Sequence, residues 1–146
     1  MLHLDDLNFS SDHSTDGEIF FSIGNSFFPG DHWFDMISDD LDQWLPRMIS
    51  FAWGHTDSCI LQFMDGPCQV KLLRSDEGTI TATCLWDGKA QIPKTEIDLQ
   101  VLLDSVLKAV REYRRISYEQ TGLSPYSEEL TTLRTILRRY QGEYYV

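Results

Sequence analysis

The chain has 146 residues, of which 42% are hydrophobic and 24% are charged, and its formal net charge at pH 7 is −11. This length suits one domain with a real hydrophobic core, and the composition argues against a disordered chain. No apolar run approaches the ~20 residues that cross a bilayer, and the first residues lack the pattern of a signal peptide. We therefore expect residues 1–146 to form a single soluble domain in the cytoplasm.

The negative charge is concentrated in the first third of the chain. Residues 1–46 contain ten acidic residues and no Lys or Arg, and the first basic residue is Arg47. Residues 47–146 hold the other 13 acidic residues and all 12 basic ones, so −10 of the −11 precedes Arg47. Such a field repels nucleic acid and anionic membranes and attracts cationic partners. A solubilising surface would have the same excess of acid, so charge alone does not establish a binding role.

The first half of the sequence predicts short strands and one helix. Residues 2–9 predict an edge strand, residues 18–23 a second strand, and residues 32–36 a short extended piece. A helix is expected after a cap at Ser38 or Asp39, because apolar residues then recur at helical spacing as far as residue 52. Pro46 must lie in its first turn or kink it, and Gly54 ends it.

The second half predicts a meander of strands followed by helices. Three strands are expected over residues 59–64, 68–74 and 79–86, joined by short turns that contain glycine, with a loop over residues 87–93. Two helices follow, one over residues 98–118 and one that begins at Ser127. The predicted fold is α+β: an antiparallel sheet of about five strands, with one helix after the second strand and two C-terminal helices packed on the sheet.

Catalytic and metal-binding motifs are not evident in the sequence. Three cysteines predict reduced strand thiols, with a Cys59–Cys68 bridge across a hairpin as the alternative. The four histidines are His3, His13, His32 and His55, and none has metal-ligand spacing. The pairs Asp31-His32 and His55-x-Asp57 could be ligands, but surface loop residues are the favoured interpretation. There is also no nucleophile elbow and no phosphate-binding glycine loop. We therefore predict no enzyme, no metal and no cofactor; a cleft that gathers His32, His55 and carboxylates would favour an enzyme instead.

Arginines and aromatic residues are the other candidates for binding. Six arginines lie in the two C-terminal helices: Arg111, Arg114, Arg115, Arg134, Arg138 and Arg139. A nucleic-acid patch is one reading, but the overall charge favours a solvated face that pairs with the acidic third. Trp33 and Phe34 lie between Asp31 and Asp35, where a large aromatic residue is a candidate interface anchor as well as a candidate core residue.

One stretch of the sequence resembles a known group of proteins. Its features are Phe27-Phe28-Pro29, Trp33, Trp44 and, most sharply, Phe63-Met64-Asp65-Gly66-Pro67. Over roughly residues 18–86 the chain resembles small α+β immunity proteins of bacterial polymorphic-toxin and contact-dependent growth inhibition systems. That group has an aromatic residue after the proline, where this chain has Cys68, and the two C-terminal helices are outside the resemblance. The resemblance implies a cytosolic protein that binds and blocks one cognate toxin domain, often a cationic nuclease.

The binding residues do not follow from the resemblance and are predicted from charge and position. They surround the loop and helix start at residues 31–42: Asp31, Trp33, Asp35, Asp39, Asp40 and Asp42. A dense patch of Asp attracts a basic toxin domain and fixes specificity through charge pairs. No nucleic-acid or membrane partner is expected. A homodimeric adaptor or regulator is the alternative function.

Overall fold

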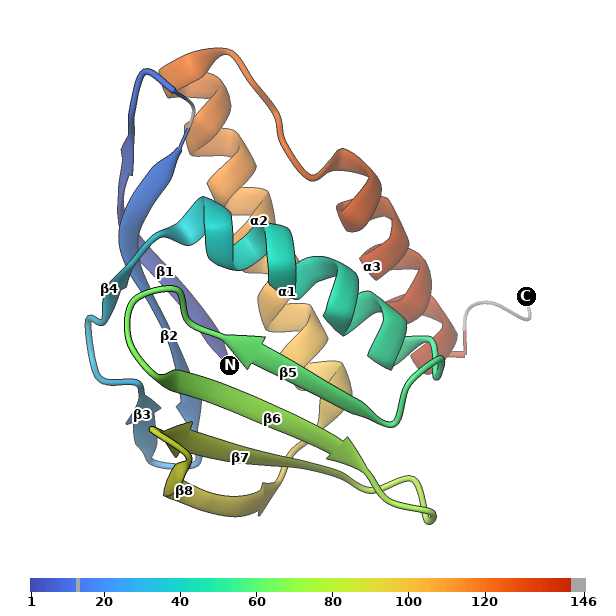
Figure 1. The fold of residues 1–146 in the computed structure, drawn as a ribbon. Coiled ribbons are helices and arrows are strands. Elements are labelled where there is room, and N and C mark those ends of the chain that lie inside the picture. The colour runs from blue at the N-terminus through green and yellow to red at the C-terminus, as the bar shows by residue number, and fades with distance from the viewer. Residues whose placement is uncertain (13, 143–146) are drawn as a thin grey trace.

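The computed structural model describes residues 1–12 and 14–142, so His13 lies outside the described residues. It contains two antiparallel sheets and, among the described residues, three helices (Figure 1). Sheet A consists of β1 (Leu2–Phe9), β2 (Thr15–Ile23), β3 (Ser26–Phe28) and β4 (Phe34–Asp35). Sheet B consists of β5 (Ser58–Gln62), β6 (Cys68–Arg74), β7 (Ile80–Trp86) and β8 (Lys89–Glu96). The helices are α1 (Ile37–Ala52), α2 (Leu99–Thr121) and α3 (Ser127–Tyr140).

The two sheets differ in how their strands pair. In sheet A, β2 is central: it pairs with β1 along most of its length, and with β3 and β4 at different points of its other edge. Sheet B is a simple meander in the order β5-β6-β7-β8. Helix α1 connects the two sheets in the chain and packs against β2 of one and β5 of the other.

One hydrophobic cluster joins the inner sides of both sheets to the three helices. Trp44 of α1 is fully buried in it, with its ring centroid 5.4 Å from that of Phe21 and 4.9 Å from that of Phe63. In Figure 1 the helices lie together on one side of the molecule, α1 in front of α2 and beside α3. Within the described part of the chain, no helix is both long and apolar enough to cross a membrane.

Helix α2 also holds the first two strands by hydrogen bonds. The backbone N–H of Leu2 donates to Ser105 Oγ at 3.0 Å, and the hydroxyls of Thr15 and Tyr113 lie 2.7 Å apart in a buried contact. These partners are 103 and 98 residues apart in the sequence. The N-terminal strands and the C-terminal helices therefore form one structural unit.

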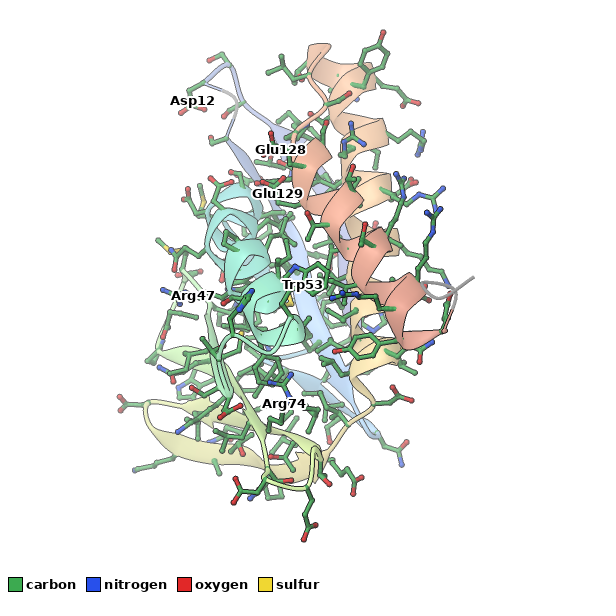
Figure 2. The ribbon with its side chains drawn as sticks, turned by 90° about the vertical axis from the view of Figure 1, so that its right-hand side faces the viewer. Asp12, Arg47, Trp53, Arg74, Glu128 and Glu129 are labelled. Carbon is green, nitrogen blue, oxygen red and sulfur yellow. The ribbon has the colours of Figure 1, made fainter. Side chains whose placement is uncertain are left out.

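Figure 2 shows how α3 covers the far end of α1. The Trp53 ring lies between the two helices, with the Arg139 guanidinium 4.6 Å from its centre. Glu128 and Glu129 lie in the first turn of α3, where the positive end of the helix dipole favours acidic side chains. Arg74 Nη2 donates to the carbonyl of Phe51 at 2.7 Å and ties β6 to the last turn of α1.

The predicted α+β class, with antiparallel strands and three helices, is confirmed, but the predicted single sheet of about five strands is wrong. The strands divide into two sheets of four, and the first helix follows the fourth strand rather than the second. The short strands β3 and β4 account for the difference, because both pair with β2 and complete sheet A before α1 begins. Their pairing depends on contacts that local sequence patterns do not encode.

The loop predicted over residues 87–93 is also wrong, because these residues form the turn and first part of β8. Asp87 and Gly88 have φ values of 52° and 77°, and Trp86 pairs with Lys89 across them. Two consecutive residues with positive φ make the type I′ turn that suits a two-residue hairpin. Pro93 lies where the register between β7 and β8 shifts, so its missing N–H falls at an irregular point of an edge strand.

Helix α1 begins earlier than predicted and carries Pro46 in its interior. Its cap position is Met36, without a side-chain cap, so neither Ser38 nor Asp39 caps it. The hydroxyl of Ser38 instead accepts a hydrogen bond from the backbone N–H of Thr15 at 2.9 Å. Pro46 is exposed and lies beyond the first turn, and Gly54, at φ 85°, follows the end of the helix as predicted.

All three cysteines are free and buried, so the predicted reduced thiols are confirmed and the Cys59–Cys68 bridge is absent. Burial raises the pKa of Cys59 and Cys68 to about 11 and that of Cys84 to about 12. A thiol acts as a nucleophile through its thiolate, which these environments disfavour.

Candidate functional site

The two faces of sheet A have different surroundings. Ile19, Phe21 and Ile23 of β2 point into the hydrophobic core. Because side chains alternate along a strand, Glu18 and Phe20 lie on the opposite face. Phe20 is only 7% exposed yet lies outside the core cluster, so something other than the core covers it.

Phe20 is covered by aromatic and histidine side chains on the outer face of the sheet. His3 of β1 stacks on it with ring centroids 4.9 Å apart and planes inclined by 11°. Phe27 of β3 and His32 meet the same ring edge-on, at 5.7 Å and 6.1 Å. The Nε2 of His3 lies 2.8 Å from Ser22 Oγ, which fixes the orientation of the imidazole.

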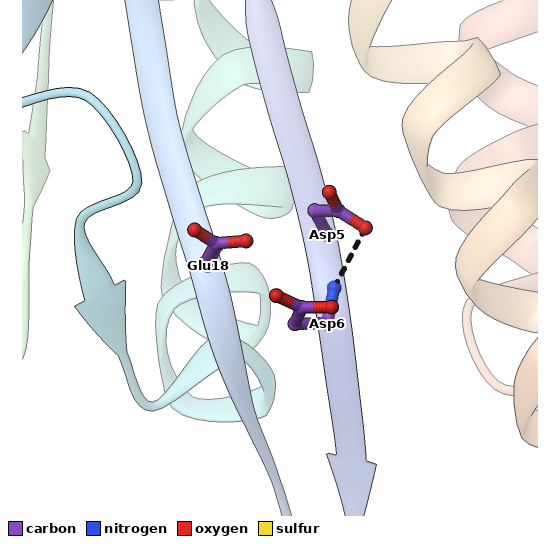
Figure 3. A group of neighbouring side chains, drawn as sticks. All are labelled: Asp5, Asp6 and Glu18. Carbon is purple, nitrogen blue, oxygen red and sulfur yellow. Dashed lines mark hydrogen bonds between the residues drawn. The ribbon is translucent and has the colours of Figure 1, made fainter.

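Three carboxylates gather next to this aromatic cluster. Figure 3 shows Asp5 and Asp6 on β1 beside Glu18 on β2, and each contributes an oxygen within 4.8 Å of the others. The backbone N–H of Asp6 donates to Asp5 Oδ1 at 2.8 Å, and His32 Nδ1 lies 2.7 Å from Glu18 Oε1. Burial, followed by the hydrogen bond and charge of Asp6, raises the pKa of Glu18.

The strand register places Phe34 on the same face, since it pairs directly with Glu18. Phe34 is 52% exposed and Phe27 is 48% exposed. Asp31 lies beside His32, with Oδ1 3.6 Å from His32 Nε2. We name this surface the sheet A face and define it by nine residues: His3, Asp5, Asp6, Glu18, Phe20, Phe27, Asp31, His32 and Phe34.

No Lys or Arg of the four strands compensates the acids of the sheet A face, because residues 1–46 contain neither, and its basic side chains are His3 and His32. Lys108 of α2 lines a groove that Asp5 and Asp6 also line, and it is paired with Asp104 at 2.8 Å. The face therefore combines an excess of acidic side chains with exposed aromatic rings.

This arrangement suits a cationic partner. The carboxylate oxygens of Asp5, Asp6 and Glu18 could coordinate a hard metal ion. Such an ion takes six or more oxygen ligands, and these three residues supply only part of that number. The same carboxylates are suitable acceptors for Lys or Arg side chains, and the rings of Phe27 and Phe34 add apolar contact area.

Two of the sequence-predicted contact residues, Asp35 and Asp40, are inside the protein. Asp35 is 1% exposed and accepts hydrogen bonds from the indole N–H of Trp33 at 3.1 Å and from the backbone N–H of Met36 at 2.6 Å. Its two oxygens also lie 3.2 Å from the backbone N–H of Asp65. Asp35 thus organises the start of α1 and the turn after β5, and offers no surface to a partner.

Asp40 binds the backbone of Met64, which precedes Asp65 in the turn after β5. It is 0% exposed, and its Oδ1 accepts from the backbone N–H of Met64 at 3.0 Å. Its Oδ2 is buried without a hydrogen-bond partner in the described chain. Burial, and then the charge of Asp35, raises the pKa of Asp40 to about 8. The Phe63–Pro67 segment that carries the resemblance is therefore a turn held by two buried carboxyls.

The remaining predicted contact residues lie in different surroundings. Asp31 belongs to the sheet A face, and Asp39 and Asp42 are exposed on α1. Asp42 Oδ1 accepts from the hydroxyl of Tyr126 at 2.6 Å. Trp33 is half-buried and meets the edge of Trp86 at 5.7 Å, so most of its surface is used within the protein. The predicted patch is divided between surface and interior.

Among the described residues, His32 and His55 do not lie together in one cleft. His32 lies beside Glu18 on sheet A, whereas His55 follows the far end of α1 and donates its backbone N–H to Ser50 O. A helix of 16 residues spans about 24 Å, which separates the two imidazoles.

The site residues predicted from the sequence did not include Asp5, Asp6 or Glu18. The available signal was the alternation of Glu18 and Phe20 with the core residues of β2, combined with antiparallel pairing to β1.

No protein-family model, curated protein or solved structure matches the chain. Function must therefore be inferred from the residues themselves.

Proposed function

We propose that the chain is a non-enzymatic immunity protein that binds a basic toxin domain through the sheet A face. The observation that carries the proposal is the exposure of Phe27 and Phe34 among the carboxylates of Asp5, Asp6 and Asp31. Aromatic residues are enriched in the cores of protein interfaces, and complementary charges steer association and fix specificity.

The charge of this face also supports fast association. All strands of sheet A lie within the first 46 residues, which carry ten acids and no Lys or Arg. A surface of one sign increases the association rate of an oppositely charged partner, and salt screens the effect over about 10 Å at 0.1 M. A cationic nuclease domain fits this requirement, because its phosphate-binding Lys and Arg side chains would contact the carboxylates.

The resemblance of the Phe63–Pro67 turn to immunity proteins supports the class of function and not the choice of surface. That turn is held by Asp35 and Asp40 inside the protein. The proposed binding surface follows only from the geometry of sheet A.

The test measures binding to the basic C-terminal domain of a large secreted protein encoded beside the gene for this chain. We expect Asp31→Lys to lower the association rate constant about tenfold at low salt, with a smaller effect at 0.5 M salt. We expect Phe34→Ala to raise the dissociation rate constant, by the equivalent of about 2 kcal/mol if the ring is an anchor. Stopped-flow or surface binding kinetics separate the two effects.

Asp39→Lys is the matched control, because Asp39 is an exposed acid of α1 outside the sheet A face. It makes the same change of charge and should leave the dissociation rate constant unchanged. If Asp39→Lys abolishes binding while Asp31→Lys and Phe34→Ala do not, the start of α1 is the interface and our assignment of the surface is wrong.

The alternative function, a homodimeric adaptor or regulator, leads to a different expected result. The mass of the isolated chain would then rise with concentration, and the chain would neither bind the neighbouring domain nor protect cells that produce it. Sedimentation and a growth-protection assay distinguish the two functions.

A further inference from the structure

Helices α2 and α3 form a second charged surface, with the opposite sign to the sheet A face. A hollow of about 310 Å³ lies where the two helices, which Figure 2 shows side by side, meet the loop that joins them. It is lined by six residues: Arg111, Arg114, Arg115, Tyr118, Ser124 and Arg134. No acidic residue is among the described side chains that line it. We name this surface the arginine hollow.

Helical spacing explains why the arginines converge. Arg111, Arg114, Arg115 and Tyr118 are three, four and seven residues apart on α2, so they share one side of that helix. Arg134 reaches the same place from α3. Arg114 Nη2 donates to Ser127 Oγ at 2.9 Å, which fixes the start of α3 against α2.

Most of this positive charge is not neutralised within the protein. Arg115 pairs with Glu112 and, at 2.7 Å, with Glu119 on its own helix. Arg111 and Arg134 are exposed and have no ion pair with any described residue. The Nε of Arg114 is buried and has no acceptor among the described atoms. In a chain with a net charge of −11, a concentration of unpaired guanidinium groups requires an explanation.

We propose that the arginine hollow binds a small phosphomonoester of the mononucleotide type. The planar guanidinium group donates two parallel hydrogen bonds and matches a phosphate better than any other side chain. Tyr118 is 64% exposed at the rim, where its ring offers a stacking platform for an aromatic base. A hollow of this size holds a phosphate and one ring system.

A small ligand is favoured over a nucleic acid. A polynucleotide would bring many phosphates towards a chain of net charge −11, and beyond the hollow most of them would meet repulsion. The arginine hollow and the sheet A face use different elements, so this proposal does not rest on the proposed immunity function.

The experiment is an amide NMR titration of the full chain at constant ionic strength. The probes are inorganic phosphate, adenosine monophosphate and adenosine. We expect saturable shifts confined to residues around 111–118, 124 and 134. Adenosine monophosphate should bind more tightly than phosphate, and adenosine should bind much more weakly than either. Saturation by adenosine alone, or shifts confined to another part of the chain, would overturn the proposal.

Two variants with the same change of residue type test the site itself. The double variant Arg111→Gln, Arg134→Gln should weaken phosphate binding about tenfold or more, because it removes charged hydrogen-bond donors. Arg138→Gln removes a charge from an exposed residue of α3 that does not line the hollow, and should change affinity less than twofold. Both variants alter exposed residues, so the fold should be retained, as amide spectra without ligand will show.

Three results would contradict the proposal. Equal weakening by Arg138→Gln would indicate general attraction to a positive helix, and unchanged binding in the double variant would place the ligand elsewhere. Affinity for single-stranded oligonucleotides that rises with their length, without saturation by adenosine monophosphate, would indicate a nucleic-acid surface instead.

Discussion

Asp40 is a carboxyl group whose titration should affect the stability of the whole protein. Its pKa is raised from 3.8 to about 8 by burial and by the charge of Asp35. Between these values the folded chain holds a proton that the unfolded chain has released. The free energy of unfolding should therefore fall as pH rises from about 4 to about 8, by up to about 1.4 kcal/mol per pH unit from this group. The stabilisation from Asp40 is complete below the pKa that its carboxyl has in the unfolded chain, and it is lost above the pKa that it has in the folded chain.

Asp40→Asn should remove this part of the pH dependence. The amide is neutral at every pH, and its oxygen can still accept the backbone N–H of Met64. Urea unfolding at pH 5, 6, 7 and 8 measures the slope in both proteins. Asp39→Asn removes the exposed neighbouring charge, which is the smallest contribution to the raised pKa of Asp40, and should keep most of the slope of the parent protein. Equal slopes in the parent and Asp40→Asn would show that Asp40 is ionised in the folded state.

Asp35 and Asp40 also show what sequence could not predict about the candidate site. Both are acids in an acidic third, next to a helix start, and local rules favour exposure for such residues. Their burial depends on β4 pairing with β2 and on the turn at Met64 and Asp65 closing over them. These contacts join segments 24 and 30 residues apart, beyond the reach of any local pattern.

At the scale of elements, the β7–β8 turn has a backbone requirement that sequence reasoning overlooked. Gly88 has φ 77°, a region that costs an alanine about 1 kcal/mol, so Gly88→Ala should lower the free energy of unfolding by about that amount. Gly30 is the matched control: it lacks such a φ, and nothing lies within 4 Å of an added Cβ. Gly30→Ala should be neutral or slightly stabilising. Thermal unfolding measures the stability of both variants. Equal decreases in the free energy of unfolding for Gly88→Ala and Gly30→Ala would mean that the turn does not need Gly88.

Most elements were predictable where the pattern is local and repeated. The predicted strand over residues 68–74 coincides with β6, and the helix predicted over residues 98–118 corresponds to α2, which the structure shows to be capped by Asp98. The Asp87-Gly88 pair was an equally clear hairpin signal, but β8 is largely exposed and contains Pro93, so it lacks the alternation that marks a strand. Which strands share a sheet was not predictable, because it depends on how α1 separates residues 2–35 from residues 58–96.

At the scale of the whole molecule, the three buried thiols should report global unfolding. Each lies in a strand of sheet B, and burial raises each pKa to about 11 or 12. A thiol-specific reagent at pH 8 should label none of them in the native protein and all three in denaturant. Labelling of one thiol at a rate independent of denaturant would show that sheet B opens locally.

The contacts of α2 with β1 and β2 have a consequence for synthesis on the ribosome. Leu2 and Thr15 take hydrogen-bond partners 103 and 98 residues later, so the first strands emerge long before the helix that covers them. At about 5–20 residues per second, the nascent chain waits on the order of 5–20 seconds before α2 can pack on β1. The N-terminal third should therefore be a chaperone client during translation, and a nascent chain halted before residue 99 should remain sensitive to protease.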